Sequence, residues 1–205
     1  MEIKENMKKK TDYTTKSKEH VKSAYPENVS DADDSKAYGI PSCPEKTDCE
    51  RLVLRPLSLM EMEQIQDRSQ DFLEKSVLTQ VIMSAVIHKI EQMHMVQSEI
   101  HPWLNYWLIS EKKSGRGVGL IGSKNLPDAE GYVEIGYAMA REYRCRGYMT
   151  EALLGFLDWL CEYPFCSGAK LLIRSANAPS IRVAENCGFE YEGMQDIYRV
   201  YRYLF

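Results

Sequence analysis

The segment that most constrains the fold is a strand, a short basic loop and a helix in succession, within residues 132–160. Residues 132–139 are rich in aromatic and β-branched side chains, which favours a strand. The loop holds Arg144, Arg146 and Gly147, and an apolar periodic segment follows from Ala152. Because the first N–H groups of a helix lack partners inside the helix and carry partial positive charge, this order predicts a phosphate site at the start of the helix.

The loop lacks the glycine spacing of a nucleoside triphosphate or dinucleotide site. It resembles instead the acetyl-CoA pyrophosphate loop of the GNAT acetyltransferases, written [QR]-x-x-G-x-[GA]. The residues that carry the resemblance are Arg144, Cys145, Arg146, Gly147, Tyr148 and Met149. Met149 departs from the small residue usual at the last position. The alternative interpretation is a basic turn ahead of an ordinary helix.

A second pattern lies one helix and one strand further along the chain. After a strand expected at 170–174 comes the run from Asn177 to Phe189, with Asn177 suited to an N-cap, Pro179 to the first turn and Gly188 to the C-cap. These residues predict a short, well-capped helix. Asn-x-x-Ser, a helix and Gly-Phe also resemble the second CoA-contacting motif of the GNAT family, in which the asparagine side chain bonds the pantetheine amides.

The two motifs, in this order and at this separation, identify residues 50–205 as similar to the GNAT family, and most closely to the branch that acetylates the N-termini of ribosomal proteins. The resemblance implies an α+β fold with a mixed, mostly antiparallel seven-stranded sheet flanked by helices. From the residues we expect strands at 51–57, 105–110, 117–122, 132–139, 170–174 and two within 190–205, and helices after Ser58, at 73–96, from 152 and from 177.

The resemblance also implies acetyl-CoA as co-substrate and no metal. It assigns cofactor contacts to main-chain groups of the strand end, to the loop and to the second motif: Ala138, Met139, Ala140, Arg144, Cys145, Arg146, Gly147, Tyr148, Met149, Thr150, Asn177 and Ser180. In the family the strand splays from its neighbour at this point, and Gly136 would suit a bend or a close approach.

Glu134 is the candidate catalytic residue, because it is the sole carboxylate of this strand and shares a face with Gly136 and Ala138 by alternation. Related enzymes use a glutamate here as general base for the attacking amine, directly or through water. The alternative is an exposed strand residue paired with a lysine or arginine. The tyrosine that many relatives use to protonate the leaving thiolate is replaced by Ala184, so that proton would come from Ser180, a C-terminal tyrosine or water.

The implied reaction is acetyl transfer to a protein N-terminal α-amine or a small-molecule amine, by direct attack in a ternary complex. A non-catalytic acyl-CoA-binding regulatory module is the alternative, which Ala184 and Met149 leave open. The acceptor site would be built from the 58–105 helices and the C-terminal strands. The aromatic residues Trp103, Tyr106 and Trp107 are candidates for its lining, although core packing is the simpler interpretation.

Composition excludes several other classes of protein. A formal net charge of −4 gives no basic field for nucleic acid, and no apolar run is long enough for a membrane span. The start of the chain has no apolar signal segment, so we expect a cytoplasmic protein, a monomer or homodimer, with reduced cysteines. Cys161 and Cys187 are expected in the core. Cys145 is either an incidental loop residue or a nucleophile activated by the basic loop.

Residues 1–49 contain no Leu, Phe, Trp or Arg. Such a composition buries little apolar surface against the entropy lost on ordering, so a polar, flexible N-terminal extension is expected ahead of the domain at 50–205. Docking of residues 21–38 on the domain or on a second subunit is the alternative.

Overall fold

The computed structural model describes residues 43–205, and the prediction for the extension falls almost entirely outside this range. The described part forms one eight-stranded sheet in the order β1-β2-β3-β4-β5-β6-β8-β7. All neighbouring strands are antiparallel except β5 and β6, which confirms the mixed, mostly antiparallel sheet. The strands are β1 (Thr47–Asp48), β2 (Leu52–Pro56), β3 (Trp107–Glu111), β4 (Gly117–Ser123), β5 (Tyr132–Met139), β6 (Gly168–Arg174), β7 (Glu190–Gln195) and β8 (Tyr198–Leu204).

The eighth strand was not predicted. It is β1, whose residues Thr47 and Asp48 pair with Leu54 and Val53 of β2. The sheet therefore begins three residues ahead of the expected domain start at residue 50. Two polar residues carry no strand periodicity, so only the pairing itself could reveal this element.

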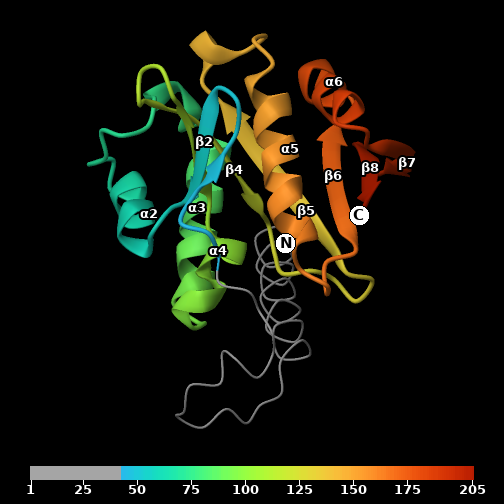
Figure 1. The fold of residues 1–205 in the computed structure, drawn as a ribbon, viewed down its shortest axis with the longest axis horizontal. Coiled ribbons are helices and arrows are strands. Elements are labelled where there is room, and N and C mark those ends of the chain that lie inside the picture. The colour runs from blue at the N-terminus through green and yellow to red at the C-terminus, as the bar shows by residue number, and fades with distance from the viewer. Residues whose placement is uncertain (1–42) are drawn as a thin grey trace, which may run out of the picture. The chain divides into compact units, whose positions relative to one another are not determined.

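Five α-helices and three 3₁₀ turns connect the strands of the described range. Figure 1 shows α5 crossing in front of the central strands and α6 beside β6. Among residues 43–205, no helix is long and apolar enough to cross a bilayer. The helices are α2 (Leu59–Gln66), α3 (Gln80–Met93), α4 (His101–Leu104), α5 (Tyr148–Cys161) and α6 (Ala178–Asn186), and the 3₁₀ turns are Lys75–Val77, Ser98–Ile100 and Arg141–Tyr143.

Local capping chemistry sets the helix starts. Ser58 accepts from the N–H of Glu61, whose side chain returns the contact, so the predicted capping box is confirmed. The helix predicted over 73–96 is shorter than expected. Thr79 caps it and α3 begins at Gln80, because Leu73 is drawn into a bridge with Gly117 and a 3₁₀ turn intervenes.

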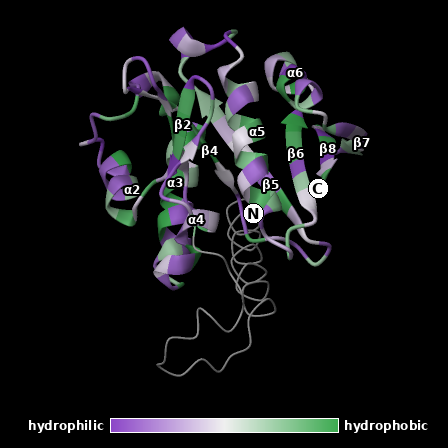
Figure 2. Cartoon of the chain, in the orientation of Figure 1, coloured by the Kyte–Doolittle hydropathy of each residue, from purple (hydrophilic) through white to green (hydrophobic). Residues whose placement is uncertain are grey.

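Helices cover both faces of the sheet, as strand alternation requires. On one face Leu108 and Leu120, which are paired across β3 and β4, join a core with α2 and α3. On the other face Trp107 meets Phe156 and Trp159 of α5, with ring centroids 5.4 and 4.5 Å apart. Figure 2 shows hydrophobic colour on β6 and alternating hydrophilic and hydrophobic bands along the helices.

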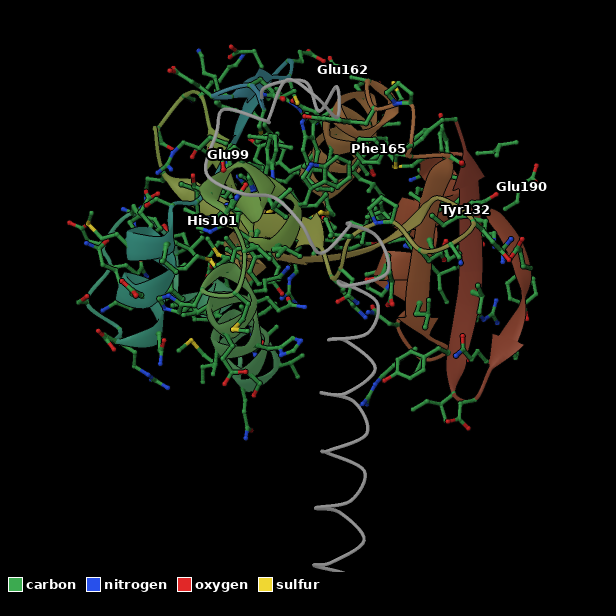
Figure 3. All side chains as sticks on the ribbon, turned by 90° about the horizontal axis from the view of Figure 1, so that it is seen from below. Glu99, His101, Tyr132, Glu162, Phe165 and Glu190 are labelled. Atoms are coloured by element: carbon green, nitrogen blue, oxygen red, sulfur yellow. The ribbon has the colours of Figure 1, made fainter. Side chains whose placement is uncertain are left out.

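Two of the candidate acceptor-site residues belong to the aromatic cluster of the core. Trp103 and Trp107 are 2% and 0% exposed, so both are core residues. Phe165, labelled in Figure 3, extends the cluster with its ring 5.3 Å from that of Trp103. Tyr106 is also buried, but it lines a cavity described below.

The cysteines are all free, and they divide differently from the prediction. Cys187 is buried as expected, and burial raises the pKa of its thiol to about 11. Cys161 is exposed, so its placement in the core was wrong. It lies on the outer face of α5, in line with the exposed residues Leu154 and Asp158, whereas its neighbour Leu160 is buried.

Candidate functional site

The loop ahead of α5 leaves the start of that helix open. The first hydrogen bond inside the helix runs from the N–H of Glu151 to the Gly147 carbonyl at 3.0 Å. Among the described residues no side chain caps the helix, so its first N–H groups, from Tyr148 to Thr150, face the loop without a side-chain acceptor. A 14-residue helix with an open N-terminus attracts an anion through both its N–H groups and its dipole.

Two residues of this loop have left-handed backbone, Cys145 at φ 59° and Gly147 at φ 76°. Glycine adopts this conformation without strain, which explains why it occupies the N-cap position. Cys145 adopts it at a steric cost and is exposed. Arg146 lies between them with its guanidinium 5.3 Å from the ring of Tyr143. The loop thus turns its backbone sharply while keeping arginine charge beside the helix end.

An arginine that the sequence analysis did not single out also reaches the loop. Arg51, just ahead of β2, donates from Nε to Glu151 at 2.7 Å and from a terminal nitrogen to the Arg146 carbonyl at 2.9 Å. The Glu151 carboxylate also accepts from the backbone N–H groups of Arg51 and Leu52. This clamp fixes the first turn of α5 to the central sheet.

Arg144 and Met149 serve different purposes in the loop. The Arg144 Nε donates to the Met139 carbonyl at 2.9 Å, so this arginine ties the loop to the end of β5. The side chain of Met149 is 8% exposed and packs into the core. A large residue is therefore accommodated at the position where the family motif has a small one, because its side chain points away from the loop.

Strands β5 and β6 separate immediately beyond Glu134. Their parallel pairing comprises Tyr132 with Gly168, Val133 with Ala169 and Glu134 with Lys170, although both strands continue for several residues. The predicted splay is therefore present. The N-terminal part of β5 is held on both sides, whereas its C-terminal part borders an opening on the β6 side.

The register of β5 decides which backbone groups face that opening. The N–H of Ala140 donates to Val118, and the N–H of Lys124 donates to Glu134. Since alternate residues of an antiparallel ladder face the same neighbour, Ala138 also faces β4. The backbone groups of Tyr137 and Met139 point to the opening. The backbone groups of Ala138 and Ala140, two predicted main-chain contacts, therefore face β4, while those of Met139, a third, face the opening.

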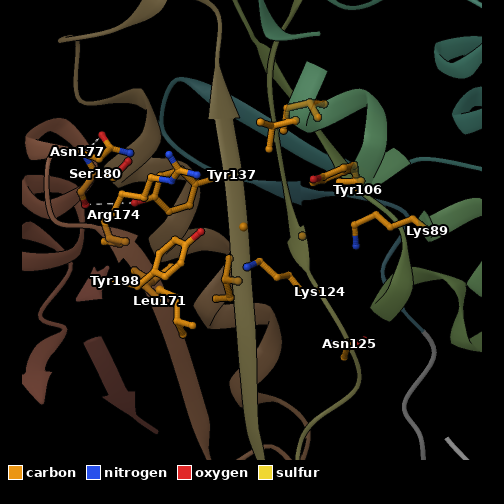
Figure 4. Close-up of a pocket in the computed structure, with 18 of the residues that line it drawn as sticks. Lys89, Tyr106, Lys124, Asn125, Tyr137, Leu171, Arg174, Asn177, Ser180 and Tyr198 are labelled. Atoms are coloured by element: carbon orange, nitrogen blue, oxygen red, sulfur yellow. Dashed lines mark hydrogen bonds between the residues drawn. The ribbon is translucent and has the colours of Figure 1, made fainter. Parts of the chain in front are cut away.

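A cavity of about 480 Å³ occupies the opening and extends to α3. Figure 4 shows Lys89, Tyr106 and Lys124 on one side of β5, and Tyr137, Asn177, Ser180 and Tyr198 on the other. Of the described residues that line the cavity, none is aspartate or glutamate, and the positively charged or titratable nitrogen groups among them are His88, Lys89, Lys124 and Arg174.

The predicted pair Asn177 and Ser180 lines the cavity at the start of α6. Asn177 caps the helix by accepting from the Ser180 N–H at 3.4 Å, so its carbonyl oxygen is used structurally and its amide nitrogen is left to donate. Tyr137 donates to the Ser180 carbonyl at 3.3 Å and links β5 to α6 across the opening. Burial raises the pKa of Tyr137 well above its usual range, so its hydroxyl stays protonated.

Glu134 lies where β5 and β6 separate, but it does not line the cavity. Its carboxylate accepts a hydrogen bond from the Lys124 ammonium, and Lys124 does line the cavity. Gly136, on the same face, has no steric need to be glycine, since an added Cβ would meet only the flexible Lys124 side chain at 3.7 Å. The ion pair anticipated as the alternative to a general base is thus present.

The position of the absent family tyrosine, Ala184, is fully buried. Among the described residues, four that carry a hydroxyl group line the cavity: Ser180, Tyr198, Tyr137 and Tyr106. Two of these were candidate proton donors from the sequence, whereas Tyr137 was missed. Within residues 43–205, no cluster of three or more His, Cys, Asp and Glu side chains is arranged to hold a metal ion.

The comparisons with known proteins identify the domain. The family model of the acetyltransferase (GNAT) domain matches residues 51–190. YjdG of Bacillus subtilis, an uncharacterised N-acetyltransferase, is 30% identical over 83 residues, which are 40% of this chain and 49% of that protein. The chain therefore spans about half the length of the curated relatives it matches.

Solved structures share the fold at low sequence identity. Mycobacterium smegmatis RimJ, in complex with CoA-disulfide, has a TM-score of 0.58 and 18% identity, over 80% of this chain and 89% of that one. The ribosomal-protein-S5-alanine acetyltransferase of Vibrio fischeri has a TM-score of 0.56 and 14% identity, over 78% and 96% of the two chains. With the family model matched over most of the described domain, this chain belongs to the GNAT acetyltransferase family.

Proposed function

We propose that this protein transfers an acetyl group from acetyl-CoA to an amine, by direct attack within a ternary complex. The observation that carries the proposal is the opening between β5 and β6 beside the uncapped start of α5. An open helix N-terminus suits a pyrophosphate, and an unpaired strand edge suits an amide-containing chain that extends from it.

The residues present fit such a ligand. The first N–H groups of α5, Gly147 and the arginines at 144 and 146 would hold the pyrophosphate. The backbone groups of Tyr137, the N–H of Met139 and the amide nitrogen of Asn177 would hold the pantetheine arm. Cys145, Tyr148, Met149 and Thr150 would take part through their backbone, because the Met149 side chain is buried and the Tyr148 hydroxyl donates to Glu111.

When bound, acetyl-CoA supplies a thioester carbon to which the amine nitrogen bonds as the carbon–sulfur bond breaks. The chain then has two tasks, to take one proton from the amine and to return one to the departing sulfur. We assign the first to Glu134, directly or through a water, with Lys124 holding the carboxylate in place. For the second we assign the hydroxyl groups of Tyr137, Tyr198 and Ser180, which lie on the other side of β5 from Lys89 and Tyr106 (Figure 4).

For the acceptor we propose a protein N-terminal α-amine or a small-molecule amine. The fold likeness to a ribosomal-protein acetyltransferase supports the first option. The cavity volume of about 480 Å³ accommodates either one terminal residue or a small molecule.

A second candidate is a non-catalytic acyl-CoA-binding module. Two observations favour it: Glu134 is occupied by an ion pair, and a buried alanine stands at the position of the family tyrosine. Both are compatible with CoA binding without turnover.

One experiment separates the two candidates. Release of free CoA from acetyl-CoA would be followed with a panel of peptides and small amines, and CoA binding would be measured by calorimetry on the same protein. Binding with amine-dependent release supports the acetyltransferase. Binding without release above the hydrolysis rate supports the module, and absence of binding contradicts both.

A further inference from the structure

A buried lysine without a counter-ion forms the α3 end of the cavity. Lys89 is 4% exposed, lies on α3 among its buried apolar residues and lines the cavity. Its ammonium donates to the backbone carbonyl of Leu104 at 2.8 Å and to that of Ser123. No carboxylate of the described residues forms an ion pair with it.

The hydrogen bonds leave part of this ammonium unused. An ammonium has three N–H donors, and the two carbonyls account for two of them. The ring of Tyr106 is a further neighbour, with its centroid 4.8 Å from Nζ. Burial, and then the charge of Lys124, lower the pKa of Lys89 to about 7, so an arriving anion would readily restore its charge.

Bridging two carbonyls does not by itself require a charge. Nearby, the Ser123 hydroxyl satisfies the Trp103 carbonyl as a neutral donor at 2.6 Å. A neutral donor could serve the Leu104 and Ser123 carbonyls in the same way, whereas a buried ammonium is costly unless it releases its proton or an anion compensates it. The position of Lys89 on the cavity wall offers a place for that anion.

The other described residues of the cavity wall supply no compensating negative charge. Lys124 forms an ion pair with Glu134, and His88 at the rim lies 3.8 Å from Glu91. Arg174 adds a positive charge on the β6 side. Since no acidic residue within 43–205 lines it, the cavity is suited to a ligand with an anionic group and unsuited to a ligand that brings only positive charge.

We propose that the acceptor amine carries a carboxylate, which Lys89 binds at the α3 end of the cavity. This inference rests on the proposed acetyl transfer and names its substrate class. The carboxylate could be the α-carboxylate of a free amino acid or the side chain of an acidic residue at a peptide N-terminus. The same positive surroundings favour the neutral form of the acceptor amine, which is the form that attacks.

The test compares matched ligands on the full chain. Glycine and glycinamide represent the first source of the carboxylate, and peptides beginning with aspartate and asparagine represent the second. In at least one of the two pairs, the acid should have a kcat/KM about tenfold or more higher than that of its amide, because Lys89 binds its carboxylate. A tenfold difference is the scale of one charge-assisted hydrogen bond. The pair that shows the preference identifies the source. Equal kcat/KM within both pairs overturns the inference.

Substitution assigns the preference to its residue. Lys89→Met retains length and removes the charge, and it should abolish the preference for the acid while leaving CoA affinity unchanged. Lys113→Met, at an exposed lysine of the β3–β4 turn, is the matched control and should retain the preference. If Lys89→Met does not fold, Lys89→Arg should fold and keep a preference for the acid. A preference that survives in a folded Lys89→Met contradicts the assignment.

A readout independent of turnover separates this inference from the proposed function. Calorimetry of N-acetylglycine and N-acetylglycinamide, with CoA present, should show tighter binding of the acid by about tenfold or more. If no amine is acetylated but this difference is found and lost in Lys89→Met, the carboxylate site stands and acetyl transfer fails. If amines are acetylated and the difference is absent, the carboxylate site fails alone.

Discussion

Gly147 offers a perturbation that separates phosphate binding from stability. Its φ of 76° lies in the left-handed region, where an L-residue costs about 1–2 kcal/mol. Gly115, in the β3–β4 turn, has a φ of 70° and nothing within 4 Å of an added Cβ. The two glycines therefore bear the same backbone strain on substitution, but only Gly147 borders the proposed pyrophosphate site.

The charge of the substituted residue sets the expected difference. In Gly147→Glu, the new carboxylate meets the α5 N-terminus and Arg51, whose terminal nitrogen lies 3.4 Å from the added Cβ. In the unliganded protein, this favourable contact offsets about 0.3–1 kcal/mol of the backbone strain. With CoA bound, a carboxylate about 5 Å from a phosphate costs about 3 kcal/mol at an effective dielectric constant of about 20, or more than 100-fold in Kd.

The assay is calorimetry with CoA alongside thermal unfolding of each variant. Gly115→Glu should lower Tm by about 2–4 °C per kcal/mol of strain and bind CoA as the unsubstituted protein does. Gly147→Glu should lower Tm no further than Gly115→Glu and lose CoA binding. Equal CoA affinity in both variants would refute the placement of the pyrophosphate at α5.

Three further outcomes are expected. Glu134→Gln should lower kcat by about 10²-fold with little change in CoA affinity, and an unchanged kcat would leave Glu134 as the partner of Lys124 alone. Tyr137→Phe should cost about 1 kcal/mol in the free energy of unfolding, and a loss of kcat beyond that of Tyr198→Phe would identify Tyr137 as the proton donor to sulfur. Between pH 7 and about 10 the unfolded state keeps Lys89 protonated, while the folded state does not. The free energy of unfolding should therefore rise with pH in this range, compared with that of Lys89→Met. Parallel pH profiles of the two proteins would contradict the low pKa.

The parts of the fold that depend on local pattern were predictable from the sequence. Strand β5 and the capping box at Ser58 follow from side-chain alternation and from cap chemistry, and both are present. The start of α3 was missed because apolar residues at 73, 77 and 78 continue the helical spacing through a turn that Thr79 ends. Their periodicity reports burial, which a 3₁₀ turn against the sheet also provides.

The parts of the site that depend on long-range contact were not predictable. The Arg51–Glu151 clamp joins residues 100 positions apart, and nothing local marks Arg51 as a neighbour of the loop. Lys89 did leave a signal, since it falls on the same helical face as Val86 and Met93, where a charge is unusual. Alternation along β5 alone places Tyr137 and Glu134 on opposite faces of the sheet. The contact of Tyr137 with α6, however, could be seen only in the structure.

The central claim is that the start of α5 and the open edge of β5 together bind acetyl-CoA. Backbone amide NMR of the protein titrated with CoA tests it most directly. We predict the largest shift changes at Tyr148, Met149 and Thr150, and at Tyr137 and Met139, with little change on β2 or β7. Changes confined to other surfaces, or none at saturating CoA, would contradict the account.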